Sequence, residues 1–367
     1  MKKVDRFRSV AILGGAGFIG SNLAHHLLET SDAKIHVFDN LSRPGVRYNL
    51  EALQRAAGNS GRLQITIGDV RDSLMLDRVL RHATEVYHFA AQVAVTTSVS
   101  DPRLDFEVNL QGTFNVLESV RKHGRRPFLF YTSTNKVYGE IASQRVAMKG
   151  ARWEYENGSG ITEEAPLDFH SPYGCSKGAA DQYVRDYARI YGIPSVVFRM
   201  SCIAGQRQYG NEDQGWVAHF LYSALANTPV VVYGDGRQVR DVLCVDDLVR
   251  AIELVREKEE ITAGQIYNVG GGPPNTTSLL ELMDRIEVLT GRRLRYQTAK
   301  PRPGDQLVYV TDPSKLKRDT GWEPKLTVAE TLEHIYEFWK RHREVFAPST
   351  QPARATAGAL QQLPDAA

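Results

Sequence analysis

Tyr173 and Lys177 are the two residues whose types and spacing most directly suggest catalysis. They stand four positions apart, where a helical pattern begins. This spacing places the phenol and the ammonium on one face of a helix. Because a nearby positive charge favours phenolate over phenol, we expect the pKa of Tyr173 to be lowered enough for it to act as a base near neutral pH. The alternative is an ordinary surface pair, because this spacing also arises by chance.

Three hydroxyl residues, Thr132, Ser133 and Thr134, directly follow the apolar stretch Phe128–Tyr131. If this stretch is a strand of a parallel sheet, the hydroxyls lie at its carboxyl end, where such sheets bind ligands. One of these hydroxyls can then hydrogen-bond the reacting oxygen of a substrate.

A glycine-rich loop suggests binding of a dinucleotide. Gly14, Gly17 and Gly20 follow the first apolar strand and open a helical pattern. Glycine permits a tight turn and a close approach of the backbone to a pyrophosphate, and the start of the helix offers free N–H groups and a partial positive charge. Taken alone, the loop is also compatible with a simple glycine-rich turn.

Two aspartates end the second and third predicted strands. Asp39 lies 19 residues beyond Gly20, where a carboxylate can accept hydrogen bonds from a ribose diol and would repel a 2′-phosphate. We therefore expect NAD rather than NADP, although the nearby Arg43 would weaken this preference. Asp69 ends the third strand and either faces the adenine end of the cofactor or caps a helix.

These residues need a sheet to position them, and the sequence predicts one. Short apolar stretches alternate with amphipathic helical patterns as far as Met200, which predicts an α/β fold with a Rossmann-like, doubly wound parallel sheet. We expect a first lobe from 1–201 plus about 239–270, and a smaller α/β substrate-binding lobe from about 202–238 plus 271–345. The stretch 346–367, rich in Ala, Pro, Gln and Thr, is expected to be a disordered tail.

Composition limits the classes of function. Among the 367 residues, 45 Lys and Arg face 43 Asp and Glu, so the formal charge is only +2 and nucleic acid is not an expected partner. The ten histidines show no ligand spacing, and the three cysteines are widely separated, so no metal site is expected and the thiols are interpreted as reduced. Neither a signal peptide nor a membrane span is recognisable, which predicts a cytoplasmic location.

The glycine loop, Asp39, the hydroxyl cluster and the Tyr173 and Lys177 pair together resemble the extended short-chain dehydrogenase/reductase family of NAD-dependent epimerases and dehydratases. In that resemblance Thr134 is the catalytic hydroxyl, Tyr173 is the base, and Lys177 also holds the nicotinamide ribose. The resemblance further implies cofactor contacts from Phe18, Ile19, Asn40, Ser42, Val70, Ala90, Ala91, Gln92, Asn109 and Thr132.

The residues after Thr134 narrow the resemblance. Sugar 4,6-dehydratases of the family carry an Asp-Glu pair there, whereas this chain has Asn135 and Lys136. The stretches 132–139, 167–183 and 213–217 are most similar to the CDP-paratose 2-epimerases, also called CDP-tyvelose 2-epimerases. The resemblance implies epimerisation at C2 of a CDP-hexose through a keto sugar, with the cofactor regenerated in each cycle.

The resemblance also implies how substrate and partner subunit are bound. Arginine forks suit a diphosphate, although each arginine alone is also compatible with a surface ion pair, and Trp216 with a place in the core. The substrate contacts are expected at Thr97, Thr134, Asn135, Lys136, Arg207, Gln208, Gln214, Trp216, Arg240 and Arg302. A homodimer is implied through the helices of about 105–123 and 172–192. Two other functions stay open: a UDP-sugar 4-epimerase, and a non-catalytic NAD-binding sensor.

Overall fold

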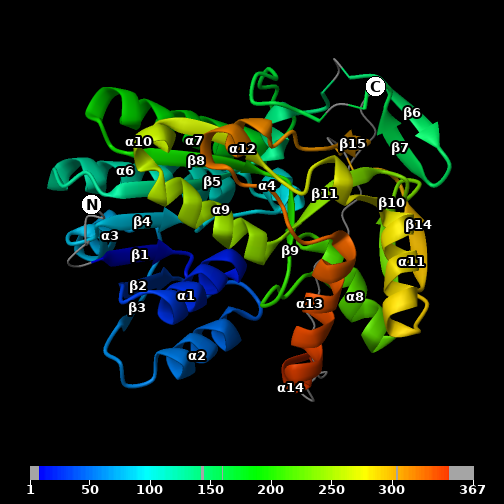
Figure 1. Ribbon diagram of the computed structural model, residues 1–367, viewed down its shortest axis with the longest axis horizontal. Helices are drawn as coiled ribbons and strands as arrows, with labels where there is room; N and C mark the ends of the chain where they lie inside the picture. The colour runs from blue at the N-terminus through cyan, green and yellow to red at the C-terminus, as the bar shows by residue number, and fades with distance from the viewer. Residues whose placement is uncertain (1–7, 142–143, 159, 303–304, 347–367) are drawn as a thin grey trace.

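Seven parallel strands form the large sheet of the protein, at the left of Figure 1. The structure is a computed structural model that describes residues 8–141, 144–158, 160–302 and 305–346. The strand order is β12-β8-β5-β4-β1-β2-β3, so the direction of winding reverses beside β1 and the predicted doubly wound sheet is confirmed. The strands are β1 (Ser9–Leu13), β2 (Lys34–Asp39), β3 (Leu63–Ile67), β4 (Glu85–His88), β5 (Phe128–Thr134), β8 (Ser195–Met200) and β12 (Gln265–Val269).

Helices cover both faces of this sheet because successive strand residues point to opposite sides. In β1, Val10 and Ile12 belong to one buried cluster, whereas Ala11 and Leu13 belong to the other. The first cluster is closed by α1 (Phe18–Thr30), α2 (Val46–Ala57), α9 (Val245–Glu257) and α12 (Ser314–Thr320). The second is closed by α3 (Ser73–Leu80), α6 (Gly112–His123) and α7 (Pro172–Tyr191).

A smaller mixed α/β region lies at the right of Figure 1 and has its own apolar core. Its central strand β11 (Val239–Cys244) pairs with β9 (Cys202–Ala204), β13 (Thr276–Ser278) and β15 (Val308–Tyr309), and β10 (Val230–Tyr233) pairs with β14 (Tyr296–Ala299). The helices of this region are α8 (Trp216–Ala226), α11 (Leu279–Thr290), α13 (Val328–Arg341) and α14 (Arg343–Phe346). A hairpin of β6 (Val146–Lys149) and β7 (Arg152–Tyr155) packs beside β15.

The chain crosses between the two regions more than once. After β11 in the small region, α9 packs on the large sheet and β12 joins the edge of that sheet next to β8. Trp322 then belongs to the core beneath the large sheet. The division into two lobes with the expected bounds stays a proposal, and the expected tail lies, from residue 347 onward, outside the described residues.

Short elements complete the connections: α4 (Val95–Ser100), α5 (Pro102–Phe106), a π-helical turn η1 (Glu107–Gln111), η2 (Asn135–Tyr138), α10 (Glu259–Thr262) and η3 (Pro273–Asn275). Among the described helices, none has both the length and the apolar character to cross a membrane.

Helix α7 carries the Tyr173 and Lys177 pair, and its start is encoded locally. Ser171 caps the helix by accepting a hydrogen bond from the N–H of Gly174 at 3.1 Å, and Pro172 occupies the first helical position. Gly192 ends the helix in the left-handed conformation that glycine adopts without strain. The predicted helical start is therefore confirmed.

Candidate active site

One cavity of about 940 Å³ runs along the carboxyl ends of the large sheet and reaches into the small region. Its walls come from the glycine loop after β1, from the ends of β2, β4 and β5, from α7, and from α8, β10 and β11. This is the edge at which doubly wound sheets bind ligands. The volume lies at the upper end of the usual range for ligand sites, about 300–1,000 Å³, and is large enough for a cofactor and a substrate side by side.

The glycine loop is shaped by contacts that leave no room for side chains. Gly14 has φ +78°, and a Cβ there would lie 2.6 Å from the backbone nitrogen of Ala90. A Cβ at Gly20 would lie 2.3 Å from the carbonyl oxygen of Gly14. Helix α1 then begins at Phe18, and its first N–H groups have no partner within the helix. The loop therefore presents a helix N-terminus to the cavity, as binding of a pyrophosphate requires.

Asp39 and Asp69 both line the cavity. The Asp39 carboxylate accepts hydrogen bonds from the N–H groups of Ala16 at 3.0 Å and Leu41 at 2.9 Å, so its position relative to the glycine loop is fixed. Burial raises the pKa of Asp39, and these N–H groups and Arg43 oppose the rise. Asp69 is not a helix cap, because Asp72 caps α3.

Thr134, Tyr173 and Lys177 lie together on the cavity wall and are almost fully buried. A hydrogen bond links the hydroxyls of Thr134 and Tyr173. Lys177 places its ammonium 4.3 Å from the centre of the Tyr131 ring, a cation–π contact from beneath the site. The structure thus brings the Thr134 hydroxyl, the Tyr173 phenol and the Lys177 amine together, as predicted.

The electrostatics of this trio differ from the expectation. Burial raises the pKa of Tyr173 to about 12, against the lowering effects of Thr134 and Arg43. Burial also lowers the pKa of Lys177 to about 7, although Asp181 and Asp105 act to raise it. The expected lowering of the Tyr173 pKa is therefore wrong for this structure, because removal from water outweighs the nearby positive charge.

A buried polar network orders the wall behind these residues. Asp105 accepts hydrogen bonds from Ser176, at 2.5 Å, and from Gln92, at 2.9 Å. Asn109, in the π-helical turn, bonds both the N–H and the carbonyl of Gln92 at 2.9 Å. The network fixes the loop after β4 against the first turns of α7 and so positions the residue that precedes Lys177.

A second buried carboxylate, Asp181, lies one turn beyond Lys177 on α7. It accepts a hydrogen bond from Ser133 at 2.9 Å and forms an ion pair with Arg199, also at 2.9 Å. The Ser133 hydroxyl is therefore occupied by Asp181, whereas the Thr134 hydroxyl contacts Tyr173.

The small-region end of the cavity contains a cluster of cations around one carboxylate. Asp305 accepts a hydrogen bond from Arg240 at 2.6 Å and one from Lys136 at 3.3 Å. The effect of these two cations on Asp305 outweighs its burial, so its pKa is lowered. Two positive groups share one negative group, which leaves a local excess of positive charge for an anionic ligand.

Arg302 lies at the same end of the cavity. Its guanidinium lies over the Tyr233 ring at 4.0 Å from the centroid and 3.4 Å from an Asp213 carboxylate oxygen. The same Asp213 oxygen accepts a hydrogen bond at 2.8 Å from Thr96, which lies in α4 beside the large sheet. The two regions are thus linked across the cavity.

Of the four side chains expected near the base and ribose of a substrate, Gln208, Gln214 and Trp216 line the cavity and Arg207 does not. Trp216 donates its indole N–H to the sulfur of Cys202 at 3.2 Å and packs on the small-region core, so both interpretations of this residue hold. The side-chain oxygen of Gln208 is buried without a hydrogen-bond partner among the described residues, which leaves an acceptor available to a ligand.

Three expected contact residues do not line the cavity. Thr97 points elsewhere, and its neighbour Thr96 lines the wall instead. Arg207 donates to the side-chain oxygen of Asn22 at 2.9 Å, behind the glycine loop. Asn109 lies behind the wall, where it bonds Gln92, Asp105 and Ser176. Every other expected site residue lines the cavity.

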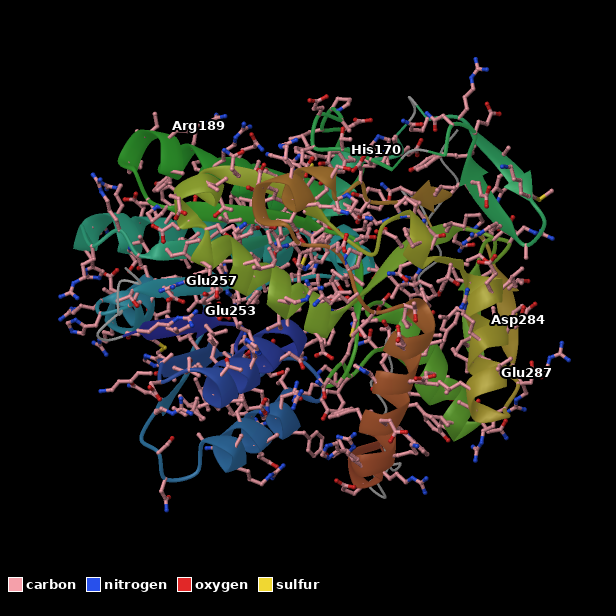
Figure 2. All side chains as sticks on the ribbon, viewed as in Figure 1. His170, Arg189, Glu253, Glu257, Asp284 and Glu287 are labelled. Atoms are coloured by element: carbon pink, nitrogen blue, oxygen red, sulfur yellow. The ribbon has the colours of Figure 1, made fainter. Side chains whose placement is uncertain are left out.

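His170, labelled in Figure 2, also lies outside the cavity. It pairs with Asp168 at 2.9 Å and Glu140 at 3.4 Å, and these carboxylates raise its pKa. His170 therefore takes part in ion pairs outside the cavity.

Sequence reasoning missed several residues that line the cavity, chiefly Thr96, Cys202, Asp213, Tyr233 and Asp305. For Asp305 a signal was present, because it closes the same short segment as Arg302. For the others no local pattern exists, since they reach the cavity only when the small region folds against the large sheet.

The whole chain was compared with known proteins. A family model described as GDP-mannose 4,6 dehydratase matches residues 11–335. The chain belongs to this family of NAD-dependent epimerases and dehydratases. The family is part of the extended short-chain dehydrogenases/reductases, and its members are enzymes that act on nucleotide sugars.

Individual members of the family are similar along nearly the whole chain. A CDP-paratose 2-epimerase from Salmonella typhi is 39% identical over 335 residues, covering 89% of this chain and 98% of the relative. The structure of a Thermotoga maritima UDP-glucose 4-epimerase with UDP-glucose superposes with a TM-score of 0.77 at 30% identity, covering 91% and 99% of the two chains. A dTDP-glucose 4,6-dehydratase, DesIV from Streptomyces venezuelae, with NAD bound, gives a TM-score of 0.79 at 30% identity, covering 92% and 98%.

The residues of this family member fit a bound dinucleotide. The glycine loop admits no side chain at Gly14 or Gly20, the N-terminus of α1 faces the cavity edge, and the Asp39 carboxylate is fixed beside the loop. The position that carries an Asp-Glu pair in the sugar dehydratases is occupied here by Asn135 and Lys136, and both line the cavity.

Proposed function

We propose that this protein is an NAD-dependent epimerase that inverts C2 of a CDP-hexose, interconverting CDP-paratose and CDP-tyvelose. One observation carries the proposal: Thr134, Tyr173 and Lys177 share a cavity with Arg240. The same cavity contains Asn135 and Lys136, an amide and an ammonium at the two positions where a dehydratase needs carboxyl groups. The similarity to the Salmonella 2-epimerase supports the choice of sugar and carbon.

The cofactor would be held by the glycine loop at its pyrophosphate, by Asp39 at the adenosine ribose, and by Lys177 at the nicotinamide ribose. When bound, NAD supplies a reversible hydride acceptor for the sugar carbon. Asp39 favours NAD because a 2′-phosphate would meet its negative charge at close range.

Tyr173 moves the proton of the reacting hydroxyl, and Thr134 orients the Tyr173 phenol through the hydrogen bond between them. In the oxidising half, Tyr173 as phenolate accepts the proton of the C2 hydroxyl, and a 2-keto sugar results. In the reducing half, the phenol returns the proton to the carbonyl oxygen. The charge of Arg43 favours the phenolate, and Asp181 and Asp105 favour the ammonium form of Lys177.

Inversion requires the keto sugar to present its other face to the same cofactor. We propose that Arg240, Lys136 and Arg302 keep the diphosphate in place while the sugar turns about its bond to the diphosphate.

A UDP-sugar 4-epimerase is the second candidate, and the similarity to the Thermotoga structure favours it. The two functions use the same trio and differ in the carbon placed beside Tyr173. Proton NMR of sugar stereochemistry separates them: the protein, with no added cofactor, is incubated with CDP-tyvelose, UDP-glucose and GDP-mannose in turn. Inversion at C2 of CDP-tyvelose is expected, and inversion at C4 of UDP-glucose alone would replace the proposal by the second candidate.

The non-catalytic sensor is tested in the same assay with Tyr173→Phe. Turnover is expected to fall by at least about 10³-fold while NAD still binds, because the variant cannot exchange the proton. Tyr296→Phe, at an exposed tyrosine of the small region, is the matched control and should retain full activity. A fully active Tyr173→Phe would contradict the assigned base.

We also propose that the protein forms a homodimer through α6 and α7 and acts in the cytoplasm. Phe114 and Tyr183 contact each other on these two helices, and both are exposed together with Ile190 and Tyr191. Exposed aromatic and aliphatic side chains grouped in this way are typical of subunit interfaces. Light scattering should give twice the chain mass, and Tyr183→Glu combined with Ile190→Glu should give a monomer.

A further inference from the structure

Three residues with metal-binding side chains meet outside the cavity. Cys244 ends β11, Asp246 lies in the first turn of α9, and His334 lies in the middle of α13. Helix α13 packs against β11, which brings the histidine to the other two (Figure 1). None of the three lines the candidate active site.

Their ligand atoms form a triangle with two similar long sides and one shorter side. Cys244 Sγ lies 3.8 Å from Asp246 Oδ2 and 3.9 Å from His334 Nδ1, and the last two atoms are 3.0 Å apart. A point equidistant from all three lies about 2.1 Å from each, compared with zinc bond lengths of about 2.0–2.3 Å to oxygen, nitrogen and sulfur. One ion therefore fits the side chains without rotating them far.

We propose that Cys244, Asp246 and His334 bind a Zn²⁺ ion. A thiolate, an imidazole and a carboxylate suit zinc, whereas calcium and magnesium prefer oxygen ligands throughout. The Asp246 and His334 side chains are about two-fifths exposed, so the ion has a route from solvent and a water can complete its tetrahedron. Binding converts the thiol of Cys244 to a thiolate, and the proton passes to solvent.

Neighbouring groups orient the ligands. Gln206 donates a hydrogen bond to the other oxygen of Asp246 at 3.3 Å, which leaves Oδ2 for the ion. The Thr331 hydroxyl, which donates to the Thr327 carbonyl at 2.8 Å, also contacts Cys244. Such supporting hydrogen bonds are characteristic of metal sites, since they fix the orientation of each ligand.

The surrounding charges are mixed. Asp247 lies near Cys244, Glu330 lies near His334, and Arg207 is the cation that faces Asp246. Asp247 is already paired with Arg250, so its charge is largely offset. The charges of the Cys244 thiolate and the Asp246 carboxylate, with Glu330 nearby, still exceed the single charge of Arg207, which favours a divalent cation.

The site would join the small region to the segment that returns to the large sheet. Cys244 and Asp246 bracket the passage from β11 to α9, and β11 pairs with β9, whose Ile203 lines the cavity. A metal that fixes α13 to this passage would stabilise the fold around the cavity. The proposal is independent of the enzyme's reaction and holds whichever sugar is the substrate.

Cobalt(II) provides the test because its thiolate complexes absorb in the near ultraviolet and its tetrahedral complexes absorb strongly in the visible. The full chain is stripped with a chelator and titrated with Co²⁺, and then with Zn²⁺ in competition. We expect one equivalent of Co²⁺ per chain, a thiolate charge-transfer band, and displacement by Zn²⁺. A titration with no charge-transfer band or with substoichiometric binding would overturn the proposal.

Variants locate the ion. Cys244→Ser should remove the charge-transfer band, and His334→Gln should weaken metal affinity at least about tenfold. Cys175→Ser, at the exposed cysteine, and His170→Gln, at a histidine with carboxylate partners but no cysteine, are the matched controls and should leave binding unchanged.

If Cys244→Ser folds too poorly to be titrated, the effect of Zn²⁺ on the Tm of the other variants tests the same proposal. Zn²⁺ should raise the Tm of the parent chain and of Cys175→Ser, but not that of His334→Gln, whose side chain is partly exposed. An equal rise in His334→Gln would overturn the assignment of these three ligands.

Discussion

Replacement of Lys177 by methionine should make the apoprotein more stable near neutral pH while it abolishes turnover. Lys177 is 3% exposed, and burial lowers the pKa of its ammonium from 10.5 to about 7. This difference corresponds to about 5 kcal/mol by which the folded state disfavours the charged form. Methionine has a similar length, carries no charge, and removes this cost.

The pH dependence follows from linkage. Between pH 7 and 10.5 the unfolded chain holds the Lys177 proton and the folded chain does not, so the stability of the parent protein rises with pH across this window. Above pH 10.5 Lys177 is neutral in both states and its burial costs no stability. As the pH falls through 7 the folded chain must also take up the proton, and the parent protein is then least stable. The stability advantage of Lys177→Met is therefore largest at pH 6, and it should shrink by about 2–3 kcal/mol between pH 7.5 and 9.5.

Urea unfolding of both apoproteins at pH 6, 7.5 and 9.5 measures this difference. Groups that do not interact with Lys177 cancel between the two proteins, and the interval ends below the range in which Tyr173 titrates, since burial raises its pKa to about 12. Lys34→Met is the matched control because its side chain is exposed. A difference between parent and Lys177→Met that does not change with pH would refute the reasoning that burial sets the charge of this amine.

Three further variants test other parts of the cavity. Gly14→Ala should lower the free energy of unfolding in urea by about 3 kcal/mol or more, because its Cβ would lie 2.6 Å from Ala90 and φ is +78°. Asp39→Ser should raise the ratio of NADP to NAD affinity, measured by fluorescence titration, at least about tenfold; an unchanged ratio would exclude Asp39 as the discriminating residue. Arg240→Ala should raise the KM for the nucleotide sugar by roughly 10- to 100-fold with a smaller change in kcat, because it removes a charged partner of the diphosphate and frees Asp305; a fall in kcat alone would place Arg240 at the reacting carbon instead.

Features set by local sequence were predictable. The doubly wound sheet follows from alternating apolar stretches, and the placement of Tyr173 beside Thr134 follows from a strand end and a capped helix start. The glycine loop was equally clear, because its spacing reflects backbone contacts within one βα unit. These features need few neighbours from elsewhere in the chain.

Features set by tertiary packing were not predictable. Thr96 rather than Thr97 lines the cavity because of how a short helix is turned, and Arg207 is directed to Asn22 by a backbone conformation with φ +64°. The pKa of Tyr173 depends on how completely it is buried, which spacing does not encode. The cluster of Cys244, Asp246 and His334 could not be predicted from spacing, because His334 lies about 90 positions from the other two in a separate helix.

The order of strands in the large sheet has a consequence for synthesis of the chain. Strand β8 is the sixth strand of the large sheet to emerge from the ribosome, and its outer edge is paired only by β12. About 65 residues of the small region and α9 must be translated in between, which takes several seconds or more at about 5–20 residues per second. During that interval the nascent first lobe exposes a bare, apolar strand edge, so chaperone occupancy and aggregation should be greatest while these residues are translated.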